Sequence, residues 1–253
     1  MYGSYERTVS VFQNSNMMAK GLPSAEEVAL LEPFRGQLPA EVFGEPYVPP
    51  VSDGSGADRA QLRKAAQLLK NAGCNVVNGK RVLPSGEPIA IEFLLDEASF
   101  EPHHMPFVRN LGTLGIDASI RLVDPVQFRA RRDGFDFDIV IDRFGFSATP
   151  GDSLRSFFSS QAAGLKGSNN LAGISEPAVD ALIDASWPPR RGLSSPPPAG
   201  RSIASFAPAV TGYRSGIKRP TGSPIGTFSG ARRRSRATSA AFRTPGGLTP
   251  IRH

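Results

Sequence analysis

The sequence predicts an α/β fold with a mixed sheet, followed by a disordered C-terminal tail. Three segments with alternating apolar residues, 89–95, 116–122 and 135–141, are separated by segments of helical character. This order is typical of strand–helix–strand units with right-handed crossovers. The charge distribution changes near the end: all 23 acidic residues precede residue 186, whereas 12 of the 29 Lys and Arg follow it. The two parts of the chain therefore belong to different classes of sequence.

Residues 1–56 are expected to form a connector with one short helix. The helix is predicted over 25–34, with Ser24 as its N-cap and two glutamates in its first turn. Proline and glycine are frequent between residues 36 and 56, which indicates an extended connection.

Residues 57–185 are expected to form the α/β domain. Its first helix covers 57–72, where Leu and Ala recur at helical spacing before Gly73. Asn78-Gly79 then predicts a type I′ hairpin between NVV and RVL.

The rest of this domain is predicted from alternation, caps and breakers. Alternating apolar residues indicate half-buried strands, and Asp-Pro is a typical start of a helix. The elements expected, in order, are strand 89–95, helix 100–114 ending at Gly115, strand 116–122, a helix starting at Asp124-Pro125, strand 135–141, a short helix near 152–158 within an ordered loop region, and a last helix over 176–185.

Residues 186–253 are expected to be disordered. Pro, Gly and Ser make up 29 of these 68 residues. Such a segment does not bury enough apolar surface to offset its chain entropy. The net charge of +6 for the whole chain is a consequence of this basic tail.

Composition and motifs exclude several functional classes. The single cysteine, Cys74, excludes an internal disulfide, and no apolar run is long enough to span a membrane. The first ten residues lack the pattern of a signal peptide, so the chain as written is expected in the cytoplasm. No P-loop, dinucleotide or zinc motif is present, and His103-His104 have no partner at metal-ligand spacing. We therefore expect no metal and no cofactor.

Two alternative functions remain open. Residues 151–154 (GDSL) match a motif of serine esterases, which use a downstream Asp-x-x-His to activate the Ser, but here the only downstream histidine is the terminal His253. The basic run 232–236 would suit phosphate backbones. Without interleaved aromatic residues it predicts polyanion binding only, with no specific nucleic-acid partner.

The stretch FDFDIVIDRFGFSATPGDSLRSFFSSQAAGLKGSNNLAGISEPAVDALIDA (135–185) resembles the C-terminal part of bacterial periplasmic oligopeptide-binding proteins. These are the family 5 extracellular solute-binding proteins of peptide ABC transporters. The stretches 15–73, NGKRVLPSGEPIAIEFLL and LGIDASIRLVDPVQFRARR are similar to the same family in the same order. Cys74 departs from the family pattern, in which Trp is commoner at that position.

The resemblance implies a lobe of a two-lobed, type II-like binding protein that is incomplete here, with most of the first lobe absent. The implied function is capture of an oligopeptide without catalysis. The implied protein is a periplasmic monomer that delivers its ligand to an inner-membrane ABC permease and ATPase. Because half of the clamshell is missing, we expect this chain to bind peptide weakly if at all.

The resemblance also implies that the segment after strand 135–141 returns to the ligand cleft. The candidate ligand-binding residues there are Asp142, Arg143, Phe144, Phe146 and Asp152. A carboxylate can pair with the α-amino group of a peptide, and an Arg with its carboxylate. In the alternative interpretation, Asp152 caps the helix at 153–158 and Arg143 forms a structural ion pair.

The tail is also interpreted as a product of a shifted reading frame. Codons exist for residues 209–230 that, read two bases later, encode RYWVPQWYKAAHRLAYWDVFG. This string resembles the C-terminal segment of the same family. We therefore expect a frameshift near residue 185.

Overall fold

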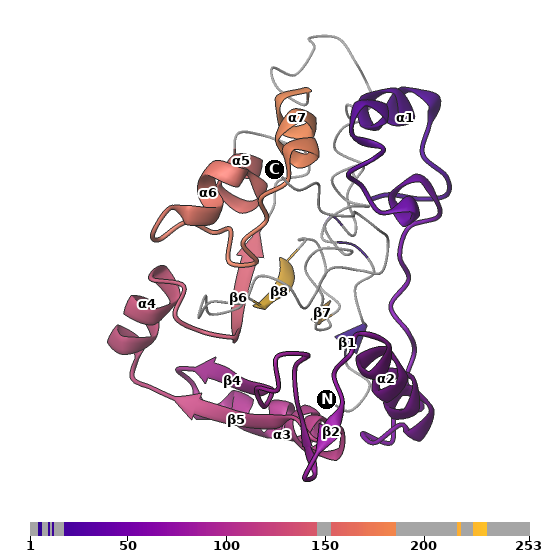
Figure 1. Cartoon of the computed structure of the whole chain (residues 1–253). Coiled ribbons are helices and arrows are strands. Elements are labelled where there is room, and N and C mark those ends of the chain that lie inside the picture. The colour runs from indigo at the N-terminus through magenta and orange to yellow at the C-terminus, as the bar shows by residue number, and fades with distance from the viewer. Residues whose placement is uncertain are drawn as a thin grey trace, which may run out of the picture. The chain divides into compact units, whose positions relative to one another are not determined.

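The computed structural model describes residues 5–6, 10, 12, 18–145, 153–185, 217–218 and 225–231 (Figure 1). Of residues 5–6, 143–145, 217–218 and 225–231, it describes the backbone only. The chain divides into two compact units: unit 1 comprises residues 1–49 and 129–232, and unit 2 comprises residues 50–128 and 233–253. The predicted domain boundaries after residues 56 and 185 stay a prediction.

Unit 2 begins with α2 (Arg59–Asn71), which matches the predicted helix. The carboxylate of Asp58 accepts hydrogen bonds from the backbone N–H groups of Ala60 and Gln61, at 2.9 and 3.0 Å, and so caps the helix. These backbone hydrogen bonds, that of Gln61 first, hold the pKa of Asp58 below its ordinary value. Gly73, with φ of +78°, ends the helix as predicted.

The predicted hairpin is confirmed. Strands β2 (Val76–Val77) and β3 (Lys80–Arg81) pair antiparallel. Asn78 and Gly79 have φ of +50° and +78°, and a type I′ turn requires positive φ at both positions. The hairpin places Arg81 in the interior of unit 2, where its side chain donates to the carbonyls of Cys74 and Leu114, each at 3.0 Å.

Strands β4 (Ala90–Leu95) and β5 (Asp117–Leu122) form a parallel pair, with Ala90 opposite Asp117 and Leu95 opposite Leu122. They are joined by η3 (Ala98–Phe100) and α3 (Glu101–Thr113). Since parallel neighbours need a crossover, this is the expected strand–helix–strand unit. The predicted α/β class with a mixed sheet is confirmed.

Helix α3 forms although its sequence contains two prolines. Pro102 lies in the first turn, where its missing N–H has no intrahelical acceptor, whereas Pro106 lies inside the helix. The helix packs Phe107 and His104 against the ring of Phe93, with ring centroids 5.8 Å apart in both pairs. This packing stabilises α3 against β4, while Pro106 donates no backbone hydrogen bond.

Helix α4 (Pro125–Asp133) starts as predicted and crosses from unit 2 into unit 1. The carboxylate of Asp124 accepts hydrogen bonds from the backbone N–H groups of Val126 and Gln127, both at 3.0 Å. Pro125 occupies the first helical position, so Asp124-Pro125 acts as the cap and first turn that the sequence predicts.

The start of the third predicted strand was wrong. Strand β6 (Ile139–Gly145) begins four residues after the predicted position. Phe135 instead has a left-handed backbone, with φ of +56°, and its N–H donates to the carbonyl of Arg132 in the turn that ends α4. Phe135 and Phe137 thus alternate before the strand, not within it. In unit 1, β6 pairs antiparallel with β8 (Ile225–Ala231), from Ile139 opposite Ala231 to Gly145 opposite Ile225 (Figure 1).

The helices of unit 1 are short. In chain order they are α1 (Ala25–Leu31), η1 (Glu32–Phe34), η2 (Ala40–Phe43), α5 (Ser153–Phe158), α6 (Ser160–Gly164) and α7 (Pro177–Ala185). Ser24 caps α1 as predicted, and the side chain of Glu27 accepts from the Ser24 backbone in return. Helix α6 was not predicted; it begins at the N-cap Ser159 directly after α5.

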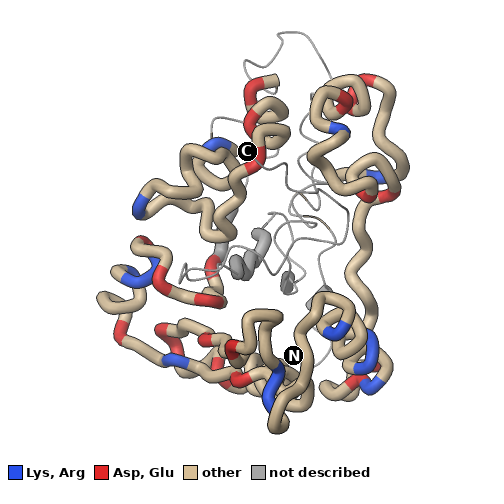
Figure 2. The backbone as a smooth tube through the Cα atoms, in the orientation of Figure 1, with Lys and Arg blue, Asp and Glu red and all other residues tan. Residues whose placement is uncertain are grey.

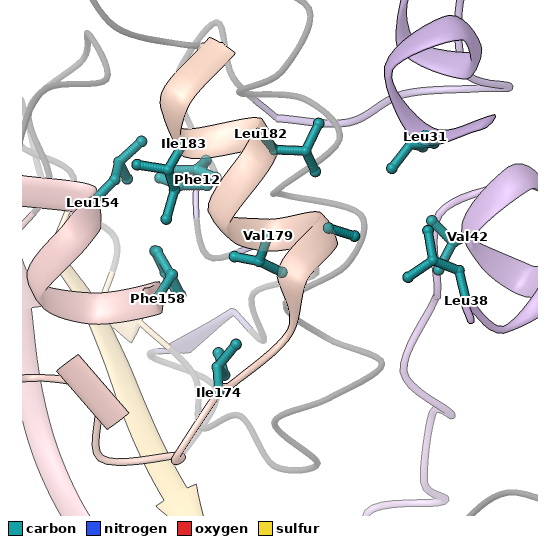
Figure 3. Close-up of a cluster of buried hydrophobic side chains, with 11 residues drawn as sticks. Phe12, Leu31, Leu38, Val42, Leu154, Phe158, Ile174, Val179, Leu182 and Ile183 are labelled. Carbon is teal, nitrogen blue, oxygen red and sulfur yellow. The ribbon is translucent and has the colours of Figure 1, made fainter. Parts of the chain in front are cut away.

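One apolar cluster contains buried residues of α1, η2, α5 and α7. Figure 3 shows Leu154 of α5, Ile183 of α7 and Phe12 close to one another. The rings of Phe12 and Phe158 meet edge to face, with centroids 6.2 Å apart. The buried members of the cluster are Phe12, Leu31, Leu38, Val42, Leu154, Phe158, Ile174, Ala178, Val179, Leu182 and Ile183.

For the predicted tail, residues 186–253, the structure describes two strand backbones. Strand β7 (Ile217–Lys218) pairs antiparallel with β1 (Tyr5–Glu6), and β8 pairs with β6. The predicted disorder and the shifted frame stay predictions. Among the helices that the structure describes, none is long and apolar enough to cross a membrane.

Candidate ligand-binding site

The predicted site residues fall on and after β6. Asp142, Arg143 and Phe144 lie in this strand, and the side chain of Asp142 is described. Phe146 and Asp152 lie outside the described residues. The predicted cap by Asp152 and the predicted ion pair of Arg143 therefore stay predictions.

Asp142 forms an ion pair with a residue that sequence reasoning missed. Arg132, in the last turn of α4, donates from Nε to the carboxylate of Asp142 at 2.5 Å. Its other two guanidinium nitrogens donate to Asp133 at 3.1 Å and to the Oδ1 of Asn169 at 3.2 Å. The side chain of Arg132 is 9% exposed, and that of Asp142 is 24% exposed. The geometry thus joins α4, β6 and the loop after α6 around one buried cation.

Asp133 connects this network to the surface. Arg129 donates from Nε to the carboxylate of Asp133 at 2.7 Å. This hydrogen bond is the main cause that holds the pKa of Asp133 below its ordinary value, and the hydrogen bond from Arg132 adds to it. The same pairing raises the pKa of Arg129. Figure 2 shows basic and acidic residues next to one another along α4 and the turn that follows.

The loop between α6 and α7 is held by buried polar groups. Asn170 is fully buried, and its Nδ2 donates to the carbonyls of Ser159 and Ile174 at 3.0 and 2.8 Å. Its Oδ1 accepts from the backbone N–H of Ile174 at 2.9 Å. The Ser168 hydroxyl donates to the carbonyl of Ala162 at 2.6 Å. The predicted ordered loop region is confirmed for this part, and its order comes from these side chains.

These polar residues gave only a weak sequence signal. Arg132 lies within RARRDGFD, where three arginines precede two aspartates, and the sequence pattern does not indicate which of these side chains is buried. Asn169-Asn170 resembles an ordinary turn dipeptide. Their partners lie up to 37 residues away in sequence, so local patterns do not reveal the network.

The esterase motif gains no support from the described geometry. Ser153 opens α5, and its carbonyl accepts from the Ser156 hydroxyl at 2.8 Å. His253 lies outside the described residues. His104 is half-buried against Phe93, with its Nδ1 2.6 Å from the carbonyl of Phe100. Within the described ranges, no group of three His, Cys, Asp or Glu side chains could hold a metal ion.

Comparison with curated proteins finds relatives over most of the described chain. The chain is 40% identical over 183 residues to the protein named "Probable peptide-binding protein YejA" of Agrobacterium fabrum. This match covers 72% of the chain and 30% of the relative. The chain is a partial relative of the YejA-like peptide-binding proteins. No family model matches it.

Two further relatives extend the YejA-like comparison. The "Peptidoglycan-binding protein YepA" of Agrobacterium fabrum and the "Uncharacterized protein YejA" of Escherichia coli K12 are each 36% identical over 184 residues, which is 72% of this chain and 30% of each relative. The chain thus spans about a third of the length of these YejA-like proteins. The matched length is close to that of the 185 residues before the predicted tail.

Comparison with solved structures gives a distant likeness to periplasmic binding proteins. The periplasmic oligopeptide-binding protein of Thermotoga maritima with bound mannohexaose aligns at a TM-score of 0.49 and 15% identity, over 78% of this chain and 39% of that one. AppA of Bacillus subtilis in complex with a nonapeptide aligns at 0.48 and 14%, over 87% and 43%. Since these scores are below 0.5, the inference about function depends on the YejA-like sequence relatives.

Proposed function

We propose that this chain is part of the solute-binding component of a bacterial ABC transporter that imports oligopeptides, and that it carries out no catalysis. The observation that carries this proposal is the 40% identity over 183 residues to a relative named as a peptide-binding protein. In this role the protein works in the periplasm as a monomer and passes its ligand to an inner-membrane permease and ATPase.

The proposed ligand contacts belong to β6 and to the sequence that follows it. Asp142, Arg143, Phe144, Phe146 and Asp152 offer two carboxylates, one guanidinium and two aromatic rings. Such a set is suited to a zwitterionic peptide, because charged ends are met by opposite charges and apolar side chains by rings. The chain spans 30% of the relative, so it supplies a part of the contacts, and we expect weak binding by this chain alone.

A second ligand class is favoured by the match to YepA. This relative is named as a peptidoglycan-binding protein and is 36% identical over 184 residues. A peptide that carries cell-wall chemistry is therefore a direct competitor of an ordinary oligopeptide for the same proposed site.

Native mass spectrometry of the purified 253-residue chain tests the proposal. The ligands are alanine tri- to pentapeptides, a peptidoglycan-derived stem peptide and free alanine as the control. We expect a 1:1 complex with one peptide class at about millimolar concentration. Acetylation of the peptide's α-amino group should weaken peptide binding about tenfold, which corresponds to about 1.4 kcal/mol of binding free energy. Equal occupancy by peptide and free alanine, or no complex with either peptide class, contradicts the proposal.

The same preparation decides between the alternative functions. Hydrolysis of a short-chain chromogenic ester that is lost in Ser153→Ala would indicate an esterase. DNA binding that weakens steeply with salt and disappears on deletion of 186–253 would indicate a polyanion-binding tail.

A further inference from the structure

Arg132 has the most buried side chain among the three arginines of α4. It is 9% exposed, compared with 16% for Arg131 and 70% for Arg129. A buried guanidinium is unfavourable unless acceptors surround it. At this position in unit 1, the chain supplies three side-chain acceptors.

The three acceptors of Arg132 belong to three different segments. Asp133 belongs to α4, Asp142 to β6, and Asn169 to the loop 165–171. Because the guanidinium is planar and its N–H directions are fixed, one side chain sets the positions of all three acceptors relative to one another. Two of the three lie 10 and 37 residues further along the chain.

A second contact attaches the same loop to the same place. The backbone N–H of Gly167 donates to the carbonyl of Asp133 at 3.0 Å, and Gly167 has φ of +79°. Lys166 and Gly167 are exposed, while Ser168 and Asn170 are buried. The loop is therefore held to α4 by two contacts, one from Arg132 to Asn169 and one from Gly167 to the carbonyl of Asp133.

We propose that Arg132 is a positioning residue, which fixes loop 165–171 against Asp142 of β6 and thereby holds this proposed ligand contact in place. In this arrangement Asp142 anchors the guanidinium and keeps its place among the proposed ligand contacts. The loop arrangement stands on the contacts alone, whereas its effect on ligand affinity rests on the proposed function.

Hydrogen exchange of the full chain tests the positioning role. In Arg132→Gln, the amides of 165–171 should exchange about tenfold faster, while those of α7 keep their protection. Arg129→Gln is the matched control, since it removes a guanidinium from the same helix and the same Asp133 but leaves the three-way contact in place. Unchanged exchange of 165–171 in Arg132→Gln, or an equal increase in Arg129→Gln, overturns the proposal.

Two further variants keep the test decisive if Arg132→Gln does not fold. Arg132→Lys keeps the charge but lacks the planar fork, and Asp142→Asn keeps the shape but lacks the charge. Both variants should increase the amide exchange rates of 165–171 several-fold. If neither variant increases these rates, the proposal is overturned. Alanine tripeptide is then added to each variant. Absence of binding to the unaltered chain rejects the proposed function, while the exchange data still decide the role of Arg132.

Discussion

The hairpin of unit 2 and the loop 165–174 of unit 1 are both irregular connections, but they are stabilised in different ways. The hairpin turn is determined locally, by two adjacent residues with positive φ. The loop is held by side chains that bond to other segments, with Asn170 bonded to the carbonyl of Ser159, 11 residues earlier, and Asn169 bonded to Arg132, 37 residues earlier. The structure of this loop therefore depends on contacts between distant parts of the sequence, whereas that of the hairpin turn does not.

The largest effect is expected when Asn170 is replaced by Ala. The substitution leaves the carbonyl and the N–H of Ile174 without their Asn170 partner in the interior, while the Ser159 carbonyl keeps only the N–H of Ala163. Because each buried unsatisfied group costs about 1–3 kcal/mol, we expect a loss of about 3 kcal/mol in the free energy of unfolding. Urea unfolding measures it. Asn169→Ala, at the half-buried neighbouring position, is the control and should cost less than half as much.

Gly115→Ala tests the tertiary contact of the hairpin in unit 2. Gly115 has φ of +81°, and an added Cβ would lie 3.0 Å from the backbone N of Arg81. Left-handed backbone and close backbone approach together should reduce the free energy of unfolding by about 2 kcal/mol. Gly112→Ala, where nothing lies within 4 Å of the added Cβ, is the control and should have no destabilising effect. Equal destabilisation by the two variants would contradict this explanation.

A smaller effect is expected at the turn itself. Gly79 has φ of +78°, but nothing lies within 4 Å of an added Cβ. Gly79→Ala should therefore cost about 1 kcal/mol, from the backbone alone. Thermal unfolding, with Gly36→Ala as a control without positive φ, measures this difference. If Gly79→Ala lowers the free energy of unfolding as much as Gly115→Ala does, the close backbone contact at Gly115 does not explain the effect of Gly115→Ala.

The sequence was sufficient where local chemistry decides the structure. Ser24, Asp124-Pro125, Asn78-Gly79 and Gly73 each act through neighbours within four residues, and each occupies its predicted place. It was insufficient where two local patterns compete. The alternation from Phe135 to Ile141 predicted one strand, yet the end of α4 places Phe135 in a left-handed turn. The turn forms because its N–H groups find acceptors at the end of the helix.

For the candidate site, the sequence indicated a segment but not its contacts, and the ligand-binding role stays a prediction. The resemblance of 135–185 indicated the segment after the predicted strand 135–141, whereas β6 extends to Gly145 and contains Asp142. Nothing in the local pattern indicated that Asp142 meets Arg132, or that Asn169 completes the group, since pairing across 10 and 37 residues depends on the tertiary fold. Helix α6 escaped prediction for a related reason: its five residues have no apolar period, and the Ser159 cap stabilises them.

Asp58 in unit 2 and Asp133 in unit 1 both have a lowered pKa, but the causes differ, so their responses to acid and salt can be compared. The pKa of Asp58 is lowered first by the backbone N–H of Gln61, whereas that of Asp133 is lowered first by the side chain of Arg129. In both cases the folded pKa lies below the unfolded value of about 4. Each group therefore stabilises the fold above that pH and loses its contribution as the pH falls through the folded pKa.

Carbon-13 detected titration of both carboxyl groups, at about 0.01 M and 1 M salt, separates the two causes. Salt screens an exposed ion pair but leaves a hydrogen bond to backbone largely intact, so the pKa of Asp133 should rise toward its ordinary value in 1 M salt, and that of Asp58 should change less. Asp58→Asn keeps a capping side chain without a titrating group, and it should remove the acid sensitivity of α2 while the helix stays formed. If salt changes the pKa of both groups equally, the proposed distinction between a backbone hydrogen bond at Asp58 and an ion pair at Asp133 is wrong.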